Sequence, residues 1–319
     1  MQALQSGEVG VFVSINIVGI GEALFDVYLD RGPDREVLGG APLNFAVHAN
    51  RLASRLGMRA APVSRVGWDA RGERIKARLA SLGVSDEYLQ PDIDHPTGTV
   101  EVSLDAAGQP SYVISPQCAW DFLQFTNEFE ELAAKCDAVC FGTLAQRRDG
   151  ARETIEAFLA KAESAIRLFD VNLRQDFYDL SMLRRGCALA TDLKVNESEL
   201  EVLSEVLDLQ GDPVAALFER FPMERLLLTR GDRGCVLFGA NNSRLEGKMV
   251  SYPAALGADA VGAGDAAAAG FVIGLLAKMS DGQVLELANH MGAWVASQPG
   301  ATPELPYSIL DLAMVRTSA

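Results

Sequence analysis

Short apolar segments alternate with longer amphipathic segments between residues 128 and 229. The apolar segments are rich in leucine and β-branched residues, which is typical of strands buried on both faces. The amphipathic segments have the apolar stripe of helices that cover a sheet. Helices are predicted at 128–135, 151–162, 182–190 and 213–221, followed in turn by strands at 138–141, 166–170, 193–195 and 225–229. This order predicts an α/β fold in which a parallel, doubly wound sheet lies between two layers of helices.

The first third of the chain adds further strands and helices. An apolar, β-branched segment at 11–20 predicts a buried strand that ends at a Gly-Ile-Gly turn. Glycines at 39 and 40 precede a segment of helical periodicity that runs to about residue 56. A short strand at 63–66 and a helix ending near residue 82 follow. These elements extend the same α/β pattern toward the N-terminus.

The segment from 97 to 114 departs from this α/β pattern. Residues 97–104 and 111–114 are β-branched and alternating, and turn-forming residues 105–110 lie between them. Because an antiparallel hairpin does not fit inside a parallel sheet, we expect the hairpin to form a lid, together with inserted strands around 25–38. Neither a linker nor a repeat divides the sequence, so residues 1–319 are predicted to form a single domain.

Polar residues follow the predicted strands at the points where these strands end. They are Asn172 and Arg174, then Asn196 and Glu199, then Thr229 and Gly231. The carboxyl ends of parallel strands meet at one edge of a sheet, and ligands of doubly wound folds bind there. These positions therefore predict a ligand-binding crevice.

Residues 259–265 form the most informative segment. Gly262 and Gly264 lie in a turn of small residues, and Asp265 follows in the first turn of an apolar helix that runs to Ala277. Free N–H groups at a helix start attract a phosphate or a developing anion, and a nearby carboxylate can accept a proton from a hydroxyl. This pairing suits phosphoryl transfer to an alcohol. The alternative is that Asp265 only caps a buried helix.

Three motifs near the N-terminus are less specific. Asp26 is expected to bind a substrate hydroxyl, or else lies in an exposed turn. Asn44, just after Gly40 at a helix start, suits a polyol ligand, although an ordinary Gly-Pro helix entry has the same sequence. The Gly-x-Gly at 19–21 resembles the start of a dinucleotide fingerprint, but Glu22 would repel a pyrophosphate.

The polar residues that follow the later strands also allow two interpretations. Arg174 can neutralise a transferred phosphate, or it forms a surface ion pair with Asp176. Asn196 and Glu199 are spaced to orient Mg²⁺ through water, or they form a capping box at a helix start. The glycine-containing loop 229–234 lies along a nucleotide, or it is only a hairpin turn.

Composition excludes several classes of function. The chain has 319 residues, 49% of them hydrophobic, which allows a sizeable core, and its formal net charge of −15 disfavours nucleic acid and anionic membranes. Five scattered cysteines without a CxxC pair are expected to be buried, reduced thiols. The longest uncharged apolar run, 266–277, is too short to cross a bilayer, and residues 1–10 lack the features of a signal peptide. We therefore expect a cytoplasmic protein.

Two segments, 39–44 (GGAPLN) and 259–265 (DAVGAGD), resemble the two signatures of the ribokinase/fructokinase (PfkB) family of sugar kinases. Further motifs follow the family's order over essentially the whole chain: Gly21-Glu22 with Asp26, Gly67-x-Asp69, Thr97-Gly98, Asn172-x-Arg174, Lys194-x-Asn196-Glu197-x-Glu199 and Thr229-x-Gly231. The segments most similar to the bacterial fructokinase branch are 97–100, 119–121, 141–147 and 172–178.

The resemblance implies a ribokinase-like three-layer αβα fold with a small β-sheet lid. It implies ATP-dependent phosphorylation of a sugar hydroxyl, with fructose as the expected sugar, Mg²⁺ and K⁺ as cations, and a homodimer paired through its lids. The family usually has Thr or Ser where this chain has Ala260. A side-chain hydroxyl is therefore lost there, while the backbone donors of the turn remain.

The resemblance also implies roles for individual residues. The base is Asp265, the N–H groups of Gly262, Ala263 and Gly264 form the anion hole, and Arg174 reaches both sugar and phosphate. The sugar-binding residues are Asp26, Gly39, Gly40, Asn44, Arg174 and Asp265. The nucleotide-binding residues are Lys194, Asn196, Thr229, Gly231, Gly234, Gly264 and Asn289. Glu199 and Asn196 serve Mg²⁺, largely through water.

Three other functions stay open at this level. The first is a kinase for ribose, 2-keto-3-deoxygluconate or adenosine, and the second is a non-catalytic sugar or nucleotide sensor. The third is a Rossmann dehydrogenase with Gly262-x-Gly264-x-x-Ala267 as its fingerprint. That fingerprint should open the first βα unit, whereas this one lies near the C-terminus.

Overall fold

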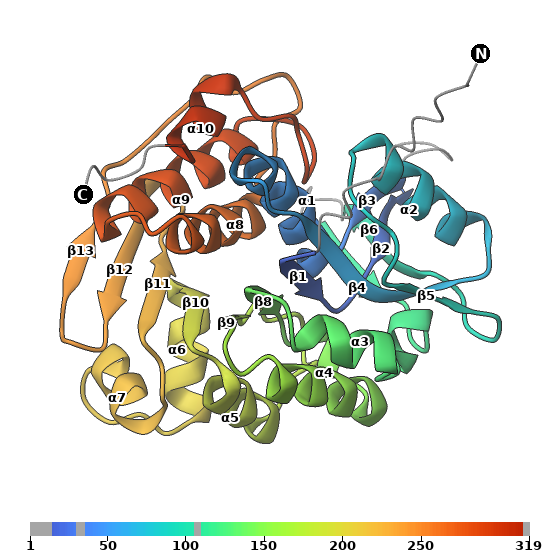
Figure 1. The fold of residues 1–319 in the computed structure, drawn as a ribbon, viewed down its shortest axis with the longest axis horizontal. Helices are drawn as coiled ribbons and strands as arrows, with labels where there is room; N and C mark the ends of the chain where they lie inside the picture. The colour runs from blue at the N-terminus through green and yellow to red at the C-terminus, as the bar shows by residue number, and fades with distance from the viewer. Residues whose placement is uncertain (1–14, 30–35, 105–109, 315–319) are drawn as a thin grey trace, which may run out of the picture.

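The computed structural model describes residues 15–29, 36–104 and 110–314. Its larger sheet has the spatial order β13 (Arg244–Glu246), β12 (Cys235–Gly239), β11 (Arg225–Thr229), β10 (Asp192–Asn196), β9 (Ile166–Asp170), β8 (Ala138–Phe141), β1 (Ile17–Ile20), β4 (Ala60–Gly67) and β5 (Leu89–Asp92) (Figure 1). Neighbours from β11 to β5 are parallel, and β12 and β13 add an antiparallel edge. The predicted parallel sheet is therefore confirmed. Of the strand predicted at 11–20, residues 11–14 lie outside the described residues.

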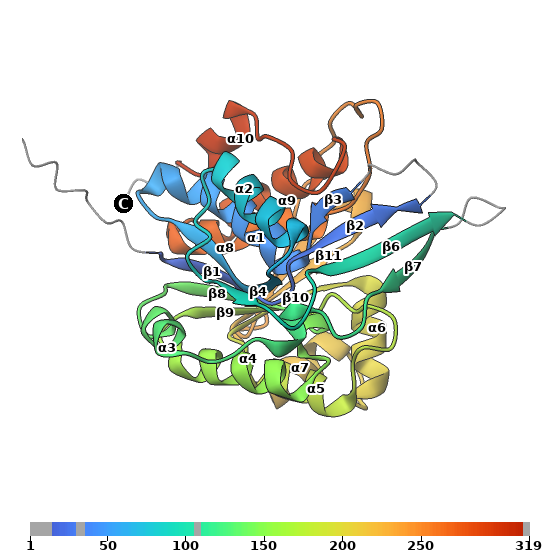
Figure 2. The same ribbon diagram turned by 90° about the vertical axis from the view of Figure 1, so that its right-hand side faces the viewer.

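Helices cover both faces of this sheet. On one side lie α1 (Ala41–Ala53), α2 (Ala70–Ser81), α8 (Ala263–Leu276), α9 (Asp281–Ala296) and α10 (Tyr307–Leu312) (Figure 2). On the other side lie α3 (Asn127–Ala133), α4 (Asp149–Lys161), α5 (Leu180–Leu189), α6 (Glu197–Val206) and α7 (Pro213–Arg220). Short 3₁₀ helices occur at Ser54–Leu56, Ala119–Phe122, Leu144–Gln146 and Gly231–Arg233. The predicted three-layer arrangement is confirmed.

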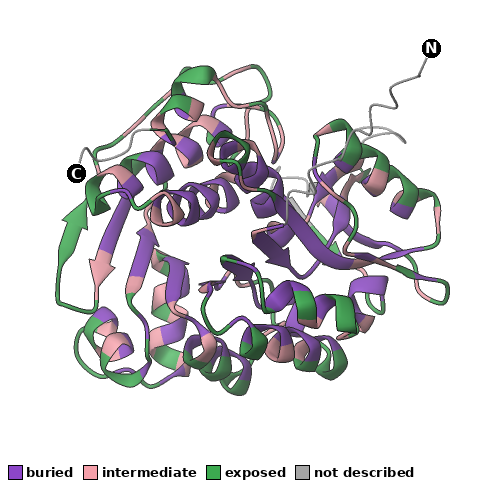
Figure 3. Cartoon of the chain, viewed as in Figure 1, coloured by how far each residue is buried: buried purple, intermediate pink, exposed green. Residues whose placement is uncertain are grey.

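Strand residues point alternately into two hydrophobic cores. On β1, Ile17 belongs to the cluster that contains Phe45 of α1 and Phe271 of α8, whereas Val18 belongs to the cluster with Phe158 of α4. Figure 3 shows the central strands buried and the outer sides of the helices exposed. Because both sheet faces are covered, these strands are apolar at nearly every position.

A second, four-stranded sheet projects from this body (Figure 2). Its order is β3 (Glu36–Gly39), β2 (Leu24–Tyr28), β6 (Gly98–Leu104) and β7 (Pro110–Ile114). β6 and β7 form the predicted antiparallel hairpin, and the hairpin lies outside the parallel sheet as predicted. The tip of the hairpin, at 105–109, is outside the described residues. We call these four strands the lid sheet.

Two α-helices and two strands of the described residues are not predicted from the sequence: α9, α10, β5 and β13. Within α9, Gly282 and Gly292 weaken the helical signal. The start of this helix still carries a sequence signal, because Ser280 and Gln283 form a capping box there. In the described part of the chain, no helix has the length and apolar character that crossing a bilayer requires.

Candidate active site

A cavity of about 890 Å³ lies at the carboxyl ends of the parallel strands, between the body and the lid sheet. Segments that follow β1, β9, β10 and β11 line its body side, and β2, β6 and β7 line its lid side. Most of the predicted site residues lie on its wall: Asp26, Gly40, Asn44, Arg174, Lys194, Asn196, Glu199, Thr229, Gly231, Gly262, Gly264 and Asp265. Tertiary structure thus brings residues from across the chain to one place.

Four predicted residues are not on the cavity wall: Gly39, Gly234, Ala263 and Asn289. Gly39 lies at the end of β3, opposite Leu24 of β2. The Asn289 amide oxygen accepts from the backbone N–H of Cys235 (2.8 Å), and its nitrogen donates to the carbonyl of Lys248 (3.2 Å). The Asn289 side chain therefore holds a neighbouring loop. Nucleotide contact by Gly234 and Asn289, sugar binding by Gly39 and the anion-hole role of Ala263 stay predictions.

The start of α8 has the geometry of an anion-binding corner. Its N-cap, Gly262, has φ +77°, and a Cβ there would lie 2.5 Å from the carbonyl oxygen of Ala301. Only glycine fits this turn, and the first N–H groups of the helix have no intrahelical partner. Asp265 lies in the first turn, buried, and its Oδ2 accepts from Nδ2 of Asn44 at 2.9 Å.

Burial raises the pKa of the Asp265 carboxyl, and nearby Lys194, the Asn44 hydrogen bond and Arg174 act in the opposite direction. A carboxylate with a raised pKa is a stronger base than an exposed aspartate. Its partner Asn44 is on α1, so two helices that begin at the same cavity fix the position of this group.

A buried lysine lies directly beneath the α8 corner. Nζ of Lys194 would be 2.8 Å from a Cβ at Gly264, so a side chain at Gly264 would displace it. The ammonium pairs with both oxygens of Asp170, at 2.9 and 3.1 Å. Burial lowers the lysine pKa, but Asp170, Glu199 and Asp265 raise it more, so Lys194 stays protonated. Its charge adds to the positive end of the helix dipole. Asp170 was not among the predicted site residues.

Two further carboxyl groups line the cavity, Glu22 after β1 and Asp26 on β2 of the lid sheet. Burial raises the pKa of Glu22 to about 7 and that of Asp26 to about 6, and in both cases Arg174 lowers it in part. Glu22 is 3% exposed and lines the cavity. In the sequence, Glu22 is part of the Gly21-Glu22 family motif and argues against a pyrophosphate site, but its burial within the site is not predicted.

The loop after β9 carries Arg174 over the cavity. Asn172 and Gln175 both have positive φ, +41° and +47°, and Oγ1 of Thr143 donates to the carbonyl of Val171 (2.9 Å) at the start of the loop. Arg174 is exposed, and within the described ranges its side chain hydrogen-bonds only the adjacent Leu173 carbonyl. The alternative ion pair with Asp176 is not formed.

Asn196 and Glu199 form the capping box that the sequence allowed. Oδ1 of Asn196 accepts from the N–H of Glu199 (2.8 Å), and Oε2 of Glu199 accepts from the N–H of Asn196 (2.8 Å). The other oxygen of Glu199 accepts from the N–H of Leu173 (3.2 Å), so this side chain also anchors the Arg174 loop. Among the described residues, no cluster of three or more His, Cys, Asp or Glu side chains could hold a metal ion. A metal role for this pair stays a prediction.

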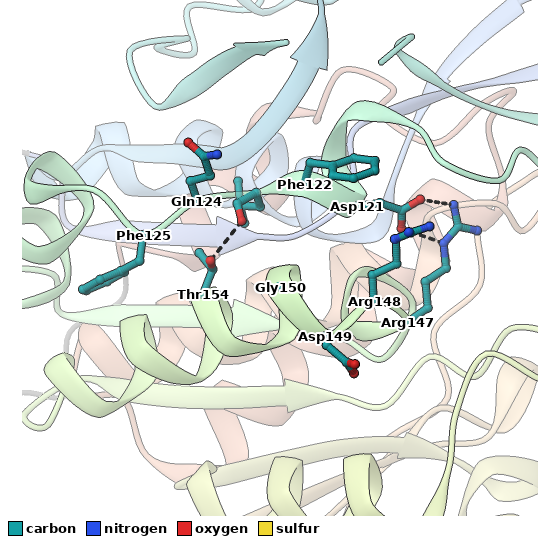
Figure 4. Close-up of a pocket in the computed structure, with 10 residues that line it drawn as sticks. Asp121, Phe122, Gln124, Phe125, Arg147, Arg148, Asp149, Gly150 and Thr154 are labelled. Carbon is teal, nitrogen blue, oxygen red and sulfur yellow. Dashed lines mark hydrogen bonds and ion pairs between the residues drawn. The ribbon is translucent and has the colours of Figure 1, made fainter. Parts of the chain in front are cut away.

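A second cavity, of about 800 Å³, lies between the Ala119–Phe122 turn and the start of α4 (Figure 4). Its buried polar groups are already paired: Arg147 binds Asp121 at 2.7 Å, and Oγ1 of Thr154 donates to the carbonyl of Leu123 at 2.9 Å. Its carboxylate beside a helix start, Asp149 at the beginning of α4, is exposed and pairs with Arg152, so it lacks the burial of Asp265. The cavity at the strand ends is therefore the candidate active site.

A three-layer αβα body, a β-sheet lid, and a buried aspartate at a glycine-rich helix start together define a sugar-kinase type of site. The chain belongs to the pfkB family of carbohydrate kinases, whose model matches residues 16–307. It is 32% identical to a fructokinase of Klebsiella pneumoniae, with 90% of this chain and 95% of that protein covered. It is 30% identical to a fructokinase of Escherichia coli, with 84% and 88% covered.

Solved structures agree with this assignment. A sugar kinase from Pyrococcus horikoshii is 26% identical, with a TM-score of 0.75 over 94% of this chain and 99% of that chain. A fructokinase from Xylella fastidiosa with bound ATP, at 22% identity, has the same fold, with a TM-score of 0.79 over 94% and 98%. The predicted family, fold and enzyme class are confirmed, and the sensor and dehydrogenase interpretations are wrong.

Proposed function

We propose that this protein transfers the γ-phosphoryl group of ATP to a hydroxyl of fructose, with Asp265 as the base. The observation that carries the proposal is the position of Asp265. It is a buried carboxyl with a raised pKa, in the first turn of α8, whose first N–H groups have no partner within the helix. A crystal structure of the Pyrococcus horikoshii sugar kinase, 25% identical, contains ATP, which supports ATP as the donor.

In the proposed reaction, the carboxylate of Asp265 accepts the proton of the sugar hydroxyl. The hydroxyl oxygen then bonds to the γ-phosphorus as the bond to the β-phosphate oxygen breaks, and ADP leaves. The N–H groups of Gly262, Ala263 and Gly264, with protonated Lys194 beneath them, stabilise the negative charge that develops. Arg174, in the loop after β9 on the same cavity, acts on the same charge, and the lid sheet excludes water.

Cations complete this proposal. Glu199 and Asn196 would hold Mg²⁺ through water; their oxygens are partly used by backbone N–H groups, which leaves lone pairs for water but not a full protein ligand set. When bound with ATP, Mg²⁺ neutralises phosphate charge.

A potassium ion is bound in a fructokinase of Vibrio cholerae. In this chain, backbone carbonyls near Asp259 and Val261 and in the loop 297–301 are the proposed K⁺ ligands. The carboxylate of Asp259 accepts from the N–H of Gly300 (3.3 Å), so these two segments lie side by side despite Ala260.

Fructose is proposed because the 32% and 30% identical bacterial relatives are fructokinases. The charge of the cavity supports an uncharged sugar. Its sugar-side wall carries Glu22, Asp26 and Asp265, against the guanidinium of Arg174. Three carboxyl groups favour a ligand rich in hydroxyl donors and repel a carboxylate or a phosphate. A sugar acid is therefore the less favoured alternative substrate.

The first test replaces Asp265 with Asn. We expect kcat to fall by roughly 10²- to 10⁴-fold, the usual contribution of a general base, with ATP affinity retained. The measurements are coupled ADP release and ATP titration. Asp212→Asn is the matched control, because Asp212 also lies at a helix start, capping α7 away from the cavity. Near-normal turnover by Asp265→Asn would exclude Asp265 as the base.

The second test compares sugars at fixed ATP. We expect fructose to give the highest kcat/KM in a panel that includes ribose, 2-keto-3-deoxygluconate and adenosine. A higher kcat/KM for any of the other three would replace fructose as the substrate and leave the kinase assignment intact.

A further inference from the structure

Glu22 lies on the wall of the candidate site, beyond the carboxyl end of β1. It follows β1 by two residues, and β1 is the strand from which the sheet order extends in both directions, to β8 on one side and to β4 on the other. The carboxyl end of such a strand is where doubly wound folds bind ligands. Its side chain is almost fully buried, yet it lies on the wall of the cavity.

Two buried oxygen atoms on this wall have no hydrogen-bond partner within the described residues. They are Oε2 of Glu22 and Oδ1 of Asn44. A buried polar atom without a partner is costly, and native proteins leave few of them. Two such acceptors on one cavity wall, beside the proposed base, indicate that a ligand supplies the missing donors.

The surroundings define the chemistry of that ligand. Lys194 is already bound to Asp170, so it does not supply the donor. A second anion beside Glu22, Asp26 and Asp265 would be repelled. A metal ion lacks ligands, since no group of three suitable side chains occurs among the described residues. A neutral hydroxyl group, which donates one hydrogen bond, fits an orphan carboxyl oxygen.

Asn44 connects this acceptor pair to the reaction. Its Nδ2 donates to Oδ2 of Asp265 at 2.9 Å, while its Oδ1 is left for the ligand. A hydroxyl bound to this amide oxygen therefore lies one side chain away from the base. A sugar anchored in this way would present a neighbouring hydroxyl to Asp265.

Resting on the proposed kinase function, we propose that Glu22 is a further substrate-binding residue. With the amide oxygen of Asn44, its free carboxyl oxygen accepts hydrogen bonds from a sugar hydroxyl near the one that is phosphorylated. Glu22 thereby orients the sugar toward Asp265. The simpler role, in which the carboxyl only stabilises the start of α1 beside the N–H of Ala41, predicts a different result.

The experiment combines two variants with altered substrates. Glu22→Ala and Glu22→Gln are assayed with the best wild-type sugar and with each of its monodeoxy derivatives. We expect Glu22→Ala to lower kcat/KM by roughly 10- to 100-fold, mainly through KM. Wild type should be less active with one of the monodeoxy sugars than with the parent sugar. Glu22→Ala should be equally active with that monodeoxy sugar and with the parent sugar. Near-isosteric Glu22→Gln, which keeps an acceptor oxygen and preserves the shape, should recover part of the affinity.

Asp179→Asn provides the matched control, since Asp179 is a helix-start carboxylate that caps α5 outside the cavity. If both Glu22 variants only lower the melting temperature, as this control should, the inference is wrong. Equal losses for every monodeoxy sugar in wild type and variants would also overturn it. If wild type forms no ADP with any sugar, the proposed function fails and the inference with it.

Discussion

At the scale of single residues, burial distinguishes the acidic side chains of the candidate active site from the other acidic side chains of the protein. Glu22, Asp26 and Asp265 are acidic residues like many others in the sequence, yet burial raises the pKa of all three. The sequence singled out Asp265 because glycines precede it. Glu22 also follows glycines and lies in a family motif, but the sequence does not predict that its carboxyl is buried, because a buried carboxyl and an exposed one have the same neighbours along the chain.

His48 is a second buried group whose environment yields a prediction. It is fully buried on α1, and its Nε2 lies 2.9 Å from the carbonyl oxygen of Ala301. Burial lowers its pKa to about 4, although the Ala301 carbonyl opposes the shift. Between pH 6.5 and about 4 the unfolded chain binds a proton that the folded chain does not. His48 therefore lowers stability as the pH falls through this window.

We predict that His48→Gln removes this pH dependence. Gln keeps a donor for Ala301 but does not titrate. The free energy of unfolding of wild type relative to the variant should fall by roughly 1.4 kcal/mol per pH unit within the window. Urea unfolding at pH 7 and at several lower pH values measures it. A constant difference between the two proteins would show that His48 titrates normally in the folded state.

At the scale of elements, the lid sheet and the Arg174 loop meet across the cavity. Nε2 of Gln175, next to Arg174, donates to the carbonyl of Tyr112 on β7 at 2.6 Å. Gln175 is held there by a loop with two positive φ values, which Thr143 and Glu199 anchor to the body. This contact joins the lid to the loop that carries Arg174, the residue proposed to bind phosphate.

We predict that Gln175→Ala loosens lid closure. One hydrogen bond contributes about 0.5–1.5 kcal/mol, so KM for the sugar should rise roughly 2- to 10-fold. ATP hydrolysis without sugar phosphorylation should also increase, because water enters the cavity. The control is Gln90→Ala, whose amide donates to the Gln124 carbonyl at 2.7 Å outside the cavity. Unchanged coupling of ATP use to sugar phosphorylation in Gln175→Ala would contradict the role.

At the scale of the whole molecule, the lid sheet exposes an edge. Within the described residues, β7 pairs only with β6, and Tyr112 and Val113 on it are 51% and 57% exposed. An unpaired apolar edge strand is a surface on which a second copy can pair. The homodimer expected from the family stays a prediction, and this edge is where it would form.

We predict that the protein sediments at twice its chain mass of 34.2 kDa and that Val113→Lys shifts it to the monomer. A charge placed on an edge strand opposes strand pairing. Sedimentation velocity measures both species. Leu256→Lys, at a fully exposed position outside the lid sheet, should leave the dimer intact. A wild-type protein that remains at its chain mass would contradict lid-mediated pairing.

The α/β order, the lid hairpin and the glycine turn before Asp265 could all be predicted from the amino-acid sequence. Apolar periodicity defines strands and helices locally, and a glycine turn before Asp265 is a local signal as well. Signals weakened by glycine, as in α9, were lost. The remaining site residues were predicted from the family motifs, and most of them lie on the wall of one cavity.

Only the tertiary structure decided which polar groups are buried and what they face. Lys194 meets Asp170 across two strands, Asn44 meets Asp265 across two helices, and Glu22 keeps an oxygen free beside them. Burial, ion pairing and unpartnered atoms depend on contacts between residues far apart in the chain. A local sequence pattern does not predict such contacts. Their effects on pKa values and on ligand binding can therefore be seen only in the folded structure.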